Sequence, residues 1–265
     1  MDIMASRAKQ IADWMKAQVA ASATHGIVVG LSGGIDSAVV VGLAAQAAPG
    51  ATVGVMMPCH SDPSDEAHAR LAAERFGVPA VRVDLAPAYD RLTGDLRSAI
   101  QSLPRSAFPI APADEVDARA RLPLANVKPR LRMATLYFVA NTLNYLVAGT
   151  GNRSELSIGY FTKYGDGGVD MLPIGRLLKS EVRALARELD VPREIVEKPP
   201  TAGLWAGQTD EGEMGFTYDD LERYLVEGPQ AVPSSLGQTI ERLARASEHK
   251  RSLPPMPPPS VYGQG

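Results

Sequence analysis

Short apolar runs alternate with helix-like segments along the first part of the chain. Three apolar runs containing β-branched residues predict buried parallel strands, at 26–31, 52–57 and 80–85. Apolar positions at helical spacing predict helices, at 7–22, from residue 37 to about 48, and at 65–76. Strands that alternate with helices imply right-handed crossovers. We therefore expect an α/β protein of one domain, with a doubly wound parallel sheet and flanking helices.

The first helix has apolar residues at steps of three and four positions, which predicts a buried face. Ile11, Trp14, Met15 and Val19 fall on this face. We expect Trp14 and Met15 to lie in the core.

The second half of the chain continues the same alternation. A predicted helix at 131–144 leads into a fourth strand at 145–149. Later helices are predicted at 177–189, from Thr217 to near Gly228, and at 234–249. Thr217 and Asp220 have the spacing of a capping box at a helix start.

Several segments lack a periodic pattern. Residues 86–125 show no clear elements, and the Pro- and Ala-rich segment 102–112 predicts a surface loop. The glycines within 160–170 predict a flexible loop. Five prolines after residue 252 predict an extended or disordered end. We see no internal repeat, and we assign residues 1–258 to one domain and 259–265 to a tail.

Composition narrows the possible partners. Hydrophobic residues make up 45% of the chain and charged residues 22%, which is typical of a soluble enzyme. The net charge of −3 gives no basic excess, so we expect neither a nucleic acid nor a membrane as a partner. Cys59 is the single cysteine, which excludes an internal disulfide and fits the cytoplasm. We expect Cys59 to be a small buried apolar residue.

The segment Ser32-Gly-Gly-Ile-Asp-Ser37 joins the first strand to a helix, where open α/β sheets bind ligands. Two glycines let backbone amides approach an anion, and the helix N-terminus favours negative charge. Asp36 suits such a site when a divalent cation lies between its carboxylate and a phosphate. The Gly-Lys pair of a Walker loop is absent, as is the third glycine of a dinucleotide fingerprint. A glycine turn capped by serine is the purely structural alternative.

The hexamer resembles the pyrophosphatase loop of the N-type ATP pyrophosphatases, which have the adenine nucleotide alpha hydrolase-like, Rossmann-like fold. In that superfamily ATP is cut between its α and β phosphates to adenylate a carbonyl oxygen. Members include NAD synthetases, GMP synthetases, asparagine synthetases and tRNA-thiolating enzymes, and the hexamer alone does not choose among them.

Later motifs make the choice. The series of motifs in the second half of the chain resembles that of ammonia-dependent NAD synthetases, and the resemblance runs from about residue 5 to 258. The loop Phe161-Thr-Lys-Tyr-Gly-Asp166 is its most specific part. Many members have Thr-Asp-His where this chain has Thr150-Gly-Asn152. The other matching segments are 126–133, 149–155, 172–174, 179–183, 200–205, 207–211 and 249–251.

The resemblance implies ATP-dependent amidation of deamido-NAD with ammonia, through an adenylate, to give NAD, AMP and pyrophosphate. It implies that ATP contacts Leu31, Ser32, Gly33, Gly34, Asp36, Ser37, Met57, Thr150, Lys179 and Thr201. It implies that deamido-NAD contacts Arg130, Lys163, Asp170, His249 and Lys250. Asp36 and Glu155 match Mg²⁺ ligands, Lys179 and Asp166 match catalytic positions, and the family's members are homodimers.

Two other functions remain open on the residues alone. One is another adenylating enzyme, of the tRNA-thiolating or GMP synthetase type; the single cysteine argues against thiolation. The other is a nucleotide-binding module without catalysis, although the pair Asp36 and Glu155 argues against a mere sensor. Each charged residue also has an ordinary surface, helix-end or turn role as its alternative. Because the synthetase pattern occupies the chain, we expect free ammonia as the nitrogen donor.

Overall fold

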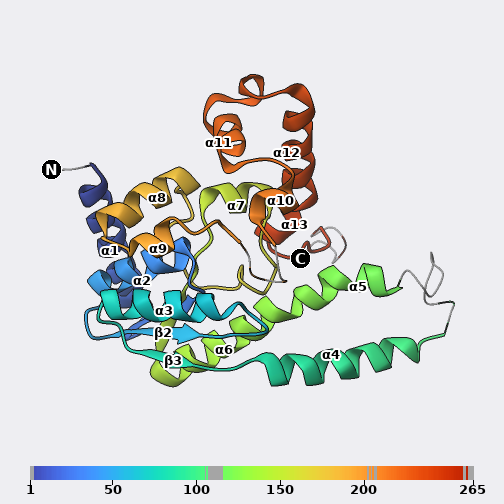
Figure 1. The fold of residues 1–265 in the computed structure, drawn as a ribbon, viewed down its shortest axis with the longest axis horizontal. Coiled ribbons are helices and arrows are strands. Elements are labelled where there is room, and N and C mark those ends of the chain that lie inside the picture. Colours follow the sequence, from blue (N-terminus) through green and yellow to red (C-terminus); the bar gives the residue numbers. More distant parts are fainter. Residues whose placement is uncertain are drawn as a thin grey trace.

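A four-stranded parallel sheet forms the centre of the computed structural model, in the order β3-β2-β1-β4 (Figure 1). The structure describes residues 3–104, 106, 116–201, 203, 205, 208–258 and 261, with the backbone alone at 116–120. The strands are β1 (Gly26–Leu31), β2 (Thr52–Met56), β3 (Ala80–Arg82) and β4 (Tyr145–Ala148). All pairings are parallel, which confirms the predicted sheet type.

Helices cover both faces of the sheet, because successive side chains of a strand point to opposite sides. Ile27, Val29 and Leu31 of β1 face one core, whereas Val28 faces the other. The first core is closed by α1 (Ile3–Ala21), α2 (Ile35–Ala47), α3 (Pro63–Arg75), α8 (Lys179–Glu188) and α9 (Arg193–Val196). The second is closed by α4 (Ala86–Gln101) and α6 (Val127–Leu143), and α5 (Val116–Ala125) packs on α6.

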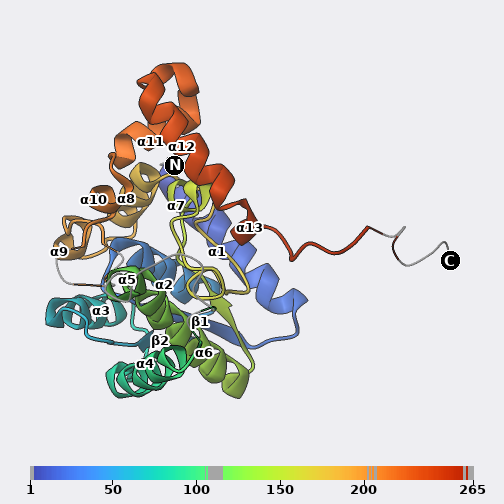
Figure 2. The ribbon, with the colours of Figure 1, turned by 90° about the vertical axis from the view of Figure 1, so that its right-hand side faces the viewer.

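Residues 153–158 and 210–251 form a helical unit beyond the carboxyl ends of the strands (Figures 1 and 2). Its core is apolar and includes Ile158, Phe216, Leu221 and Ile240. The unit consists of α7 (Arg153–Ile158), α10 (Asp210–Met214), α11 (Tyr218–Glu227), η3 (Pro229–Ala231), α12 (Ser234–Ala246) and α13 (Glu248–Arg251). Thr217 caps α11 as predicted, since its hydroxyl accepts a bond from the Asp220 N–H.

Three predictions about the elements need correction. Trp14 is 41% exposed, because α1 buries the narrower stripe of Ala8, Ala12 and Met15. The third strand ends at Arg82, although the N–H groups of Val83 and Leu85 still donate to β2 and its extension. Segment 86–101 is a regular helix that sequence analysis did not find. The buried Cys59 is confirmed.

The structure describes only parts of the predicted surface loop and of the C-terminal segment. Residues 253–258 are exposed and have no helix or strand, and they run away from the body in Figure 2. Most of the predicted loop 102–112 lies outside the described residues. The division between a domain at 1–258 and a tail at 259–265 stays a prediction. Among the described helices, none is both long and apolar enough to cross a membrane.

Candidate active site

The loop after β1 has a backbone that requires glycine. Gly33 has φ of +76°, and a Cβ there would lie 2.2 Å from the carbonyl oxygen of Asp65. The Ser37 hydroxyl donates to Gly34 O at 2.9 Å and accepts from Ser32 N at 3.3 Å. These contacts fix the loop at the N-terminus of α2, a position that favours an anion.

Three predicted residues meet beside this loop. Lys179, the first residue of α8, places Nζ 2.5 Å from Asp36 Oδ2 and 3.4 Å from Glu155 Oε1. Its side chain is only 2% exposed, and both carboxylates are largely shielded. The structure therefore brings together residues from α2, α7 and α8 that are up to 143 positions apart in the sequence.

Asn152, which has no role predicted from the sequence, binds both Asp36 and Glu155. The Asn152 side chain accepts a hydrogen bond from Glu155 N, and the Glu155 side chain accepts one from Asn152 N. These two bonds form a capping box at the start of α7. Asn152 Nδ2 also donates to Asp36 Oδ1 at 3.0 Å. The spacing of Asn152 and Glu155 is itself a sequence signature of a helix start. This turn, where the chain departs from Thr-Asp-His, thus orients both carboxylates.

Two further residues of the site were not predicted. Tyr218 OH lies 2.9 Å from Asp210 Oδ2 and 3.4 Å from Glu155 Oε1. Asp210 is 4% exposed. Asp36 and Glu155 thus contact the ammonium of Lys179 directly, and Tyr218 links Asp210 to Glu155.

Burial and charge shift the pKa values of this cluster. Burial raises the pKa of Glu155 to about 8, against the lowering effect of Lys179. Burial also raises the pKa of Asp210. Burial would lower the pKa of Lys179, but the carboxylates of Asp36 and Glu155 outweigh it, and its pKa lies above the ordinary value. Negative charge in the cluster is thus incompletely balanced, and a further cation would stabilise it.

We expect the raised pKa of Glu155 to make stability depend on pH in Mg²⁺-free buffer. Between its ordinary pKa of 4.5 and about 8, the folded protein holds a proton that the unfolded chain releases. The free energy of unfolding should therefore fall as pH rises through this window, by at most about 1.4 kcal/mol per pH unit from this group. Denaturant unfolding from pH 5 to 8 should show a shallower fall for Glu155→Gln. Equal slopes for both proteins would contradict the assignment.

A second group of predicted residues meets at the 160–170 loop. Arg130 Nε and Nη2 each lie 3.4 Å from the carbonyl oxygen of Lys163. Lys163 Nζ donates in turn to the carbonyl oxygen of His249. Lys250 Nζ donates to the carbonyl oxygens of Gly159 at 2.7 Å and Phe161 at 2.8 Å. The structure thus joins α6, this loop and α13 into one cationic surface.

Asp166 lies within the same loop. Its Oδ1 accepts a bond from Thr162 N at 2.9 Å, so it also stabilises the turn. The side chain is accessible to water, yet the protein atoms packed around its carboxyl group raise its pKa. The nearby charges of Lys250 and Arg132 act in the opposite direction. Arg132, unassigned from sequence, donates to the carbonyl oxygen of Met57 at the end of β2.

The remaining predicted residues are distributed around these two groups. Leu31 and Met57 are buried at the ends of β1 and β2, and Thr150 follows β4. Thr201 is exposed and accepts a bond from Gly203 N. Asp170 stands apart: its carboxylate accepts from Tyr137 OH at 2.9 Å and Val147 N at 2.8 Å. Nothing in these contacts joins Asp170 to the cationic surface.

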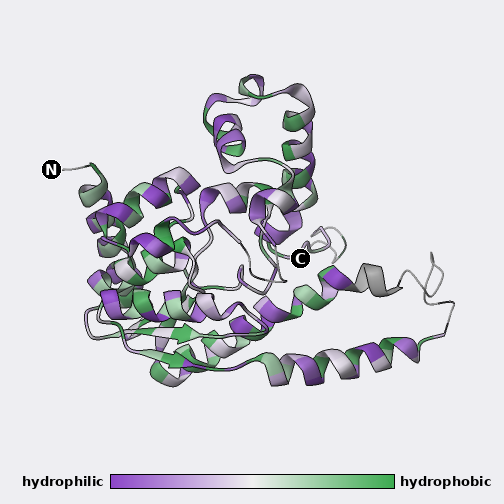
Figure 3. Cartoon of the chain, viewed as in Figure 1, coloured by the Kyte–Doolittle hydropathy of each residue, from purple (hydrophilic) through white to green (hydrophobic). Residues whose placement is uncertain are grey.

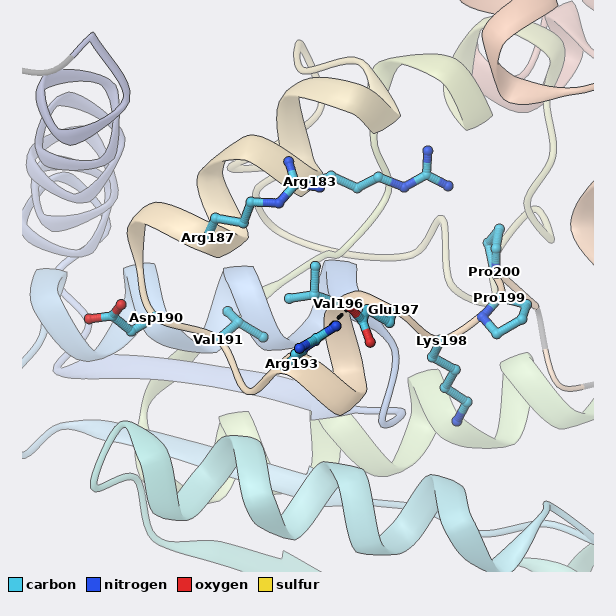
Figure 4. A pocket seen from close by; sticks show the side chains of 10 residues that line it. All are labelled: Arg183, Arg187, Asp190, Val191, Arg193, Val196, Glu197, Lys198, Pro199 and Pro200. Carbon is cyan, nitrogen blue, oxygen red and sulfur yellow. Dashed lines mark hydrogen bonds and ion pairs between the residues drawn. The ribbon is translucent and has the colours of Figure 1, made fainter.

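A groove of about 760 Å³ lies between α8 and the segment that follows it (Figure 4). Arg183 extends from α8 over this groove, and Lys198 and Pro200 line its far end. The groove ends one residue before Thr201, so it lies beside the predicted ATP position. Its other lining residues are Arg187, Asp190, Val191, Arg193, Val196, Glu197 and Pro199.

The sheet order, the glycine loop at the end of β1 and the Asp36–Lys179–Glu155 cluster define a nucleotide-binding α/β protein of the adenine nucleotide alpha hydrolase-like class. Comparison with known proteins identifies the family. Residues 7–254 match the NAD synthase family. The chain belongs to this family, which confirms the family predicted from sequence.

Individual relatives agree with this assignment. The NH(3)-dependent NAD(+) synthetase of Carboxydothermus hydrogenoformans is 46% identical over 95% of this chain and 96% of its own. An NMN synthetase structure from Francisella tularensis has a TM-score of 0.84 and 33% identity, covering 97% of this chain and 99% of its own. An NAD+ synthetase structure from Burkholderia pseudomallei has a TM-score of 0.71 and 30% identity, covering 96% and 92%.

Proposed function

We propose that this chain uses ATP and ammonia to amidate deamido-NAD, releasing NAD, AMP and pyrophosphate. The observation that carries the proposal is the contact of Lys179 with both Asp36 and Glu155 beside the glycine loop. A nicotinate carboxylate is a poor electrophile, so it must be activated before ammonia attacks. Adenylation activates it and gathers negative charge on the α phosphate and the departing pyrophosphate, which buried cations and preorganised amides stabilise.

Asp36 and Glu155 are the residues that would hold Mg²⁺. The excess of carboxylates over cations in the buried cluster fits a divalent cation. Mg²⁺ typically uses one or two carboxylates together with substrate phosphates, so two acids suffice here. Groups of three or more metal-binding side chains are absent from the described residues. When bound, Mg²⁺ would neutralise charge on the phosphates of ATP.

Residues of the chain itself bind the phosphates and stabilise the charge that develops on them. The backbone of the glycine loop and the N-terminus of α2 are proposed to bind phosphate oxygens, since Gly33 and Gly34 carry no side chain that would keep an anion away. Lys179 stays charged because its pKa is raised, so it stabilises the pyrophosphate that leaves. Arg130, Lys163 and Lys250 provide positive charge for the phosphates of deamido-NAD.

Free ammonia is the proposed nitrogen donor. The chain matches the full length of relatives named NH(3)-dependent synthetases. The test is to incubate the purified protein with ATP, Mg²⁺, deamido-NAD and either ammonium or glutamine. Ammonium should give NAD, AMP and pyrophosphate in equal amounts. NAD formation from ammonium-free glutamine at a similar rate would overturn the choice of donor.

Nicotinate mononucleotide is a second candidate substrate, because the Francisella tularensis structure is of a protein named NMN synthetase. The cationic surface around Lys163 favours the dinucleotide, whose two phosphates need more positive charge than one. Comparing kcat/KM for the two nucleotides distinguishes these substrates. Because Cys59 is a buried free thiol, we also propose a cytoplasmic location.

Asp166 is proposed to attract ammonium and to accept its proton. We expect Asp166→Asn to leave adenylation, measured as pyrophosphate release, within about threefold of wild type while NAD formation falls at least tenfold, in the range of general base effects. NAD formation should recover partly at high pH, where free ammonia is abundant. The bond to Thr162 N offers a purely structural alternative, which Asn preserves. Near-normal NAD formation at neutral pH and low ammonium would favour that alternative.

A homodimer is proposed from apolar surface on the second face of the sheet. Leu92, Leu96 and Ile100 form an exposed stripe along α4, and Phe138 on α6 is 74% exposed. Figure 3 shows hydrophobic residues along α4, which projects from the body. Self-complementary two-fold interfaces commonly bury such faces.

Sedimentation at micromolar concentration should show a dimer for the wild-type chain. Leu96→Asp should raise the dissociation constant of the dimer at least tenfold, because burying an unpaired charge in the interface costs more than about 1.4 kcal/mol. Val226→Asp, on an exposed apolar residue of α11, is the matched control and should leave the dimer intact. A wild-type protein that is monomeric throughout would exclude the dimer.

A further inference from the structure

Tyr218 contacts three charged groups of the adenylation site from one buried position. Its hydroxyl lies 2.9 Å from Asp210 Oδ2 and 3.4 Å from Glu155 Oε1. The centre of its ring lies 5.2 Å from Lys179 Nζ, within the range of a cation–π contact. The residue is 1% exposed.

Asp210 connects this tyrosine to the rest of the C-terminal unit. Its second oxygen, Oδ1, accepts from Tyr160 OH at 3.3 Å. Its backbone N–H donates to the carbonyl oxygen of Pro200 at 3.2 Å, which ties the start of α10 to the segment before Thr201. Asp210 therefore contacts the site through its side chain and the segment before Thr201 through its backbone.

We propose that Tyr218 is a positioning residue that holds Lys179 and Glu155 in the arrangement required for adenylation, with Asp210 coupling this arrangement to the segment before Thr201. The inference rests on the proposed function, because it assigns a role within the same reaction. It adds two residues to the site whose hydrogen bonds and ring contacts, within the described residues, do not reach loop 32–37, and of which Asp210 contacts Tyr160 at the start of the 160–170 loop.

Packing alone does not account for a tyrosine here. The ring belongs to the apolar core of the helical unit with Leu221 and Ile240, a role that phenylalanine would fill equally well. The hydroxyl, however, points away from this core toward two carboxylates. A buried hydroxyl between acids restricts their orientations, and the ring faces the ammonium that joins Asp36 to Glu155.

The experiment compares Tyr218→Phe with Tyr224→Phe. Tyr224 lies on the same helix, α11, and its hydroxyl contacts Glu241 at 3.2 Å, away from the site. Both substitutions remove one hydroxyl and keep the ring. Pyrophosphate release, ATP binding by calorimetry and thermal unfolding are measured for each protein.

Tyr218→Phe should lower kcat for pyrophosphate release by about 10- to 100-fold, the range expected for a small misplacement of catalytic groups. Its KM for ATP and its calorimetric Kd should stay within about threefold of wild type, since phosphate-binding groups remain. Tyr224→Phe should stay within about twofold in kcat. A merely structural role would instead alter KM, Kd and thermal stability together.

Asp210→Asn provides the second variant. Asparagine keeps one acceptor for a tyrosine hydroxyl and presents an NH₂ donor in place of the other, so this variant should be less impaired than Asp210→Ala. The defects of Tyr218→Phe and Asp210→Asn should combine to less than their product, because contacting residues act together. If Tyr218→Phe does not fold, an Asp210→Asn variant that folds must show the loss of kcat.

Wild-type kcat in Tyr218→Phe, or full multiplicative effects in the double variant, would overturn the inference while the proposed function stands. A wild-type protein that releases no pyrophosphate would overturn the proposed function and the inference with it.

Discussion

Replacing Lys179 with methionine is expected to lower the rate of pyrophosphate release by a factor of about 100 to 1,000, the cost of removing one preorganised group that stabilises transition-state charge. Methionine keeps much of the side-chain volume but leaves Asp36 and Glu155 without their shared ammonium. Without this ammonium, which lowers the pKa of Glu155, that pKa should rise further. The steady-state rate with saturating ATP and deamido-NAD measures the effect.

The matched control is Lys9→Met, because Lys9 forms an exposed ion pair with Asp13 on α1. Exposed pairs contribute little, so this variant should keep its activity within about twofold. Circular dichroism and thermal unfolding must show that Lys179→Met is folded. A folded Lys179→Met protein with more than a tenth of wild-type activity would contradict the role of Lys179.

Replacing Asp36 with alanine is expected to reduce adenylation by at least about 100-fold and to remove its dependence on Mg²⁺ concentration. Asp36 occupies the second position of α2, where its carboxylate meets both Lys179 and the amide of Asn152. Loss of this carboxylate removes one of the two proposed metal ligands. Pyrophosphate release should be measured across a Mg²⁺ titration.

Asp219→Ala is the control, because Asp219 holds the same second position of a helix, α11, at an exposed site. It shares any helix-dipole effect of Asp36 but touches no part of the cluster. It should therefore retain activity and a normal Mg²⁺ response. Wild-type pyrophosphate release by Asp36→Ala would show that the metal assignment is wrong.

Sequence reasoning recovered the sheet because buried parallel strands carry a strong apolar signal. The four predicted strands all occur, with small errors at their ends. The loop 32–37 was recognisable since its glycines and serines occupy neighbouring positions at a strand end. The contact of Asp36 with Glu155 through Lys179 agrees with the resemblance, but the residue types alone specify no distance.

Other features depend on tertiary contacts that leave little trace in the sequence. The prediction that Trp14 lies in the core is wrong, because the helical period gives the direction of the buried face of α1 but not its width. Helix α4 was missed although Leu92, Leu96 and Ile100 recur at helical spacing, so this signal is present in the sequence. Tyr218 lay within a helix-start pattern, and Asp210 lay within the family-like segment 207–211 without a predicted role. Their role emerges only where α10 and α11 fold back onto α7 and α8.

The most direct test of the central claim uses deamido-NAD labelled with ¹⁸O in its nicotinate carboxylate. Adenylation transfers one carboxylate oxygen to the α phosphate of ATP, and ammonia then expels it with AMP. Mass spectrometry of the products should therefore find one ¹⁸O in AMP for each NAD formed, and none in pyrophosphate. Unlabelled AMP, or label in pyrophosphate or orthophosphate, would contradict activation of the carboxylate by adenylation.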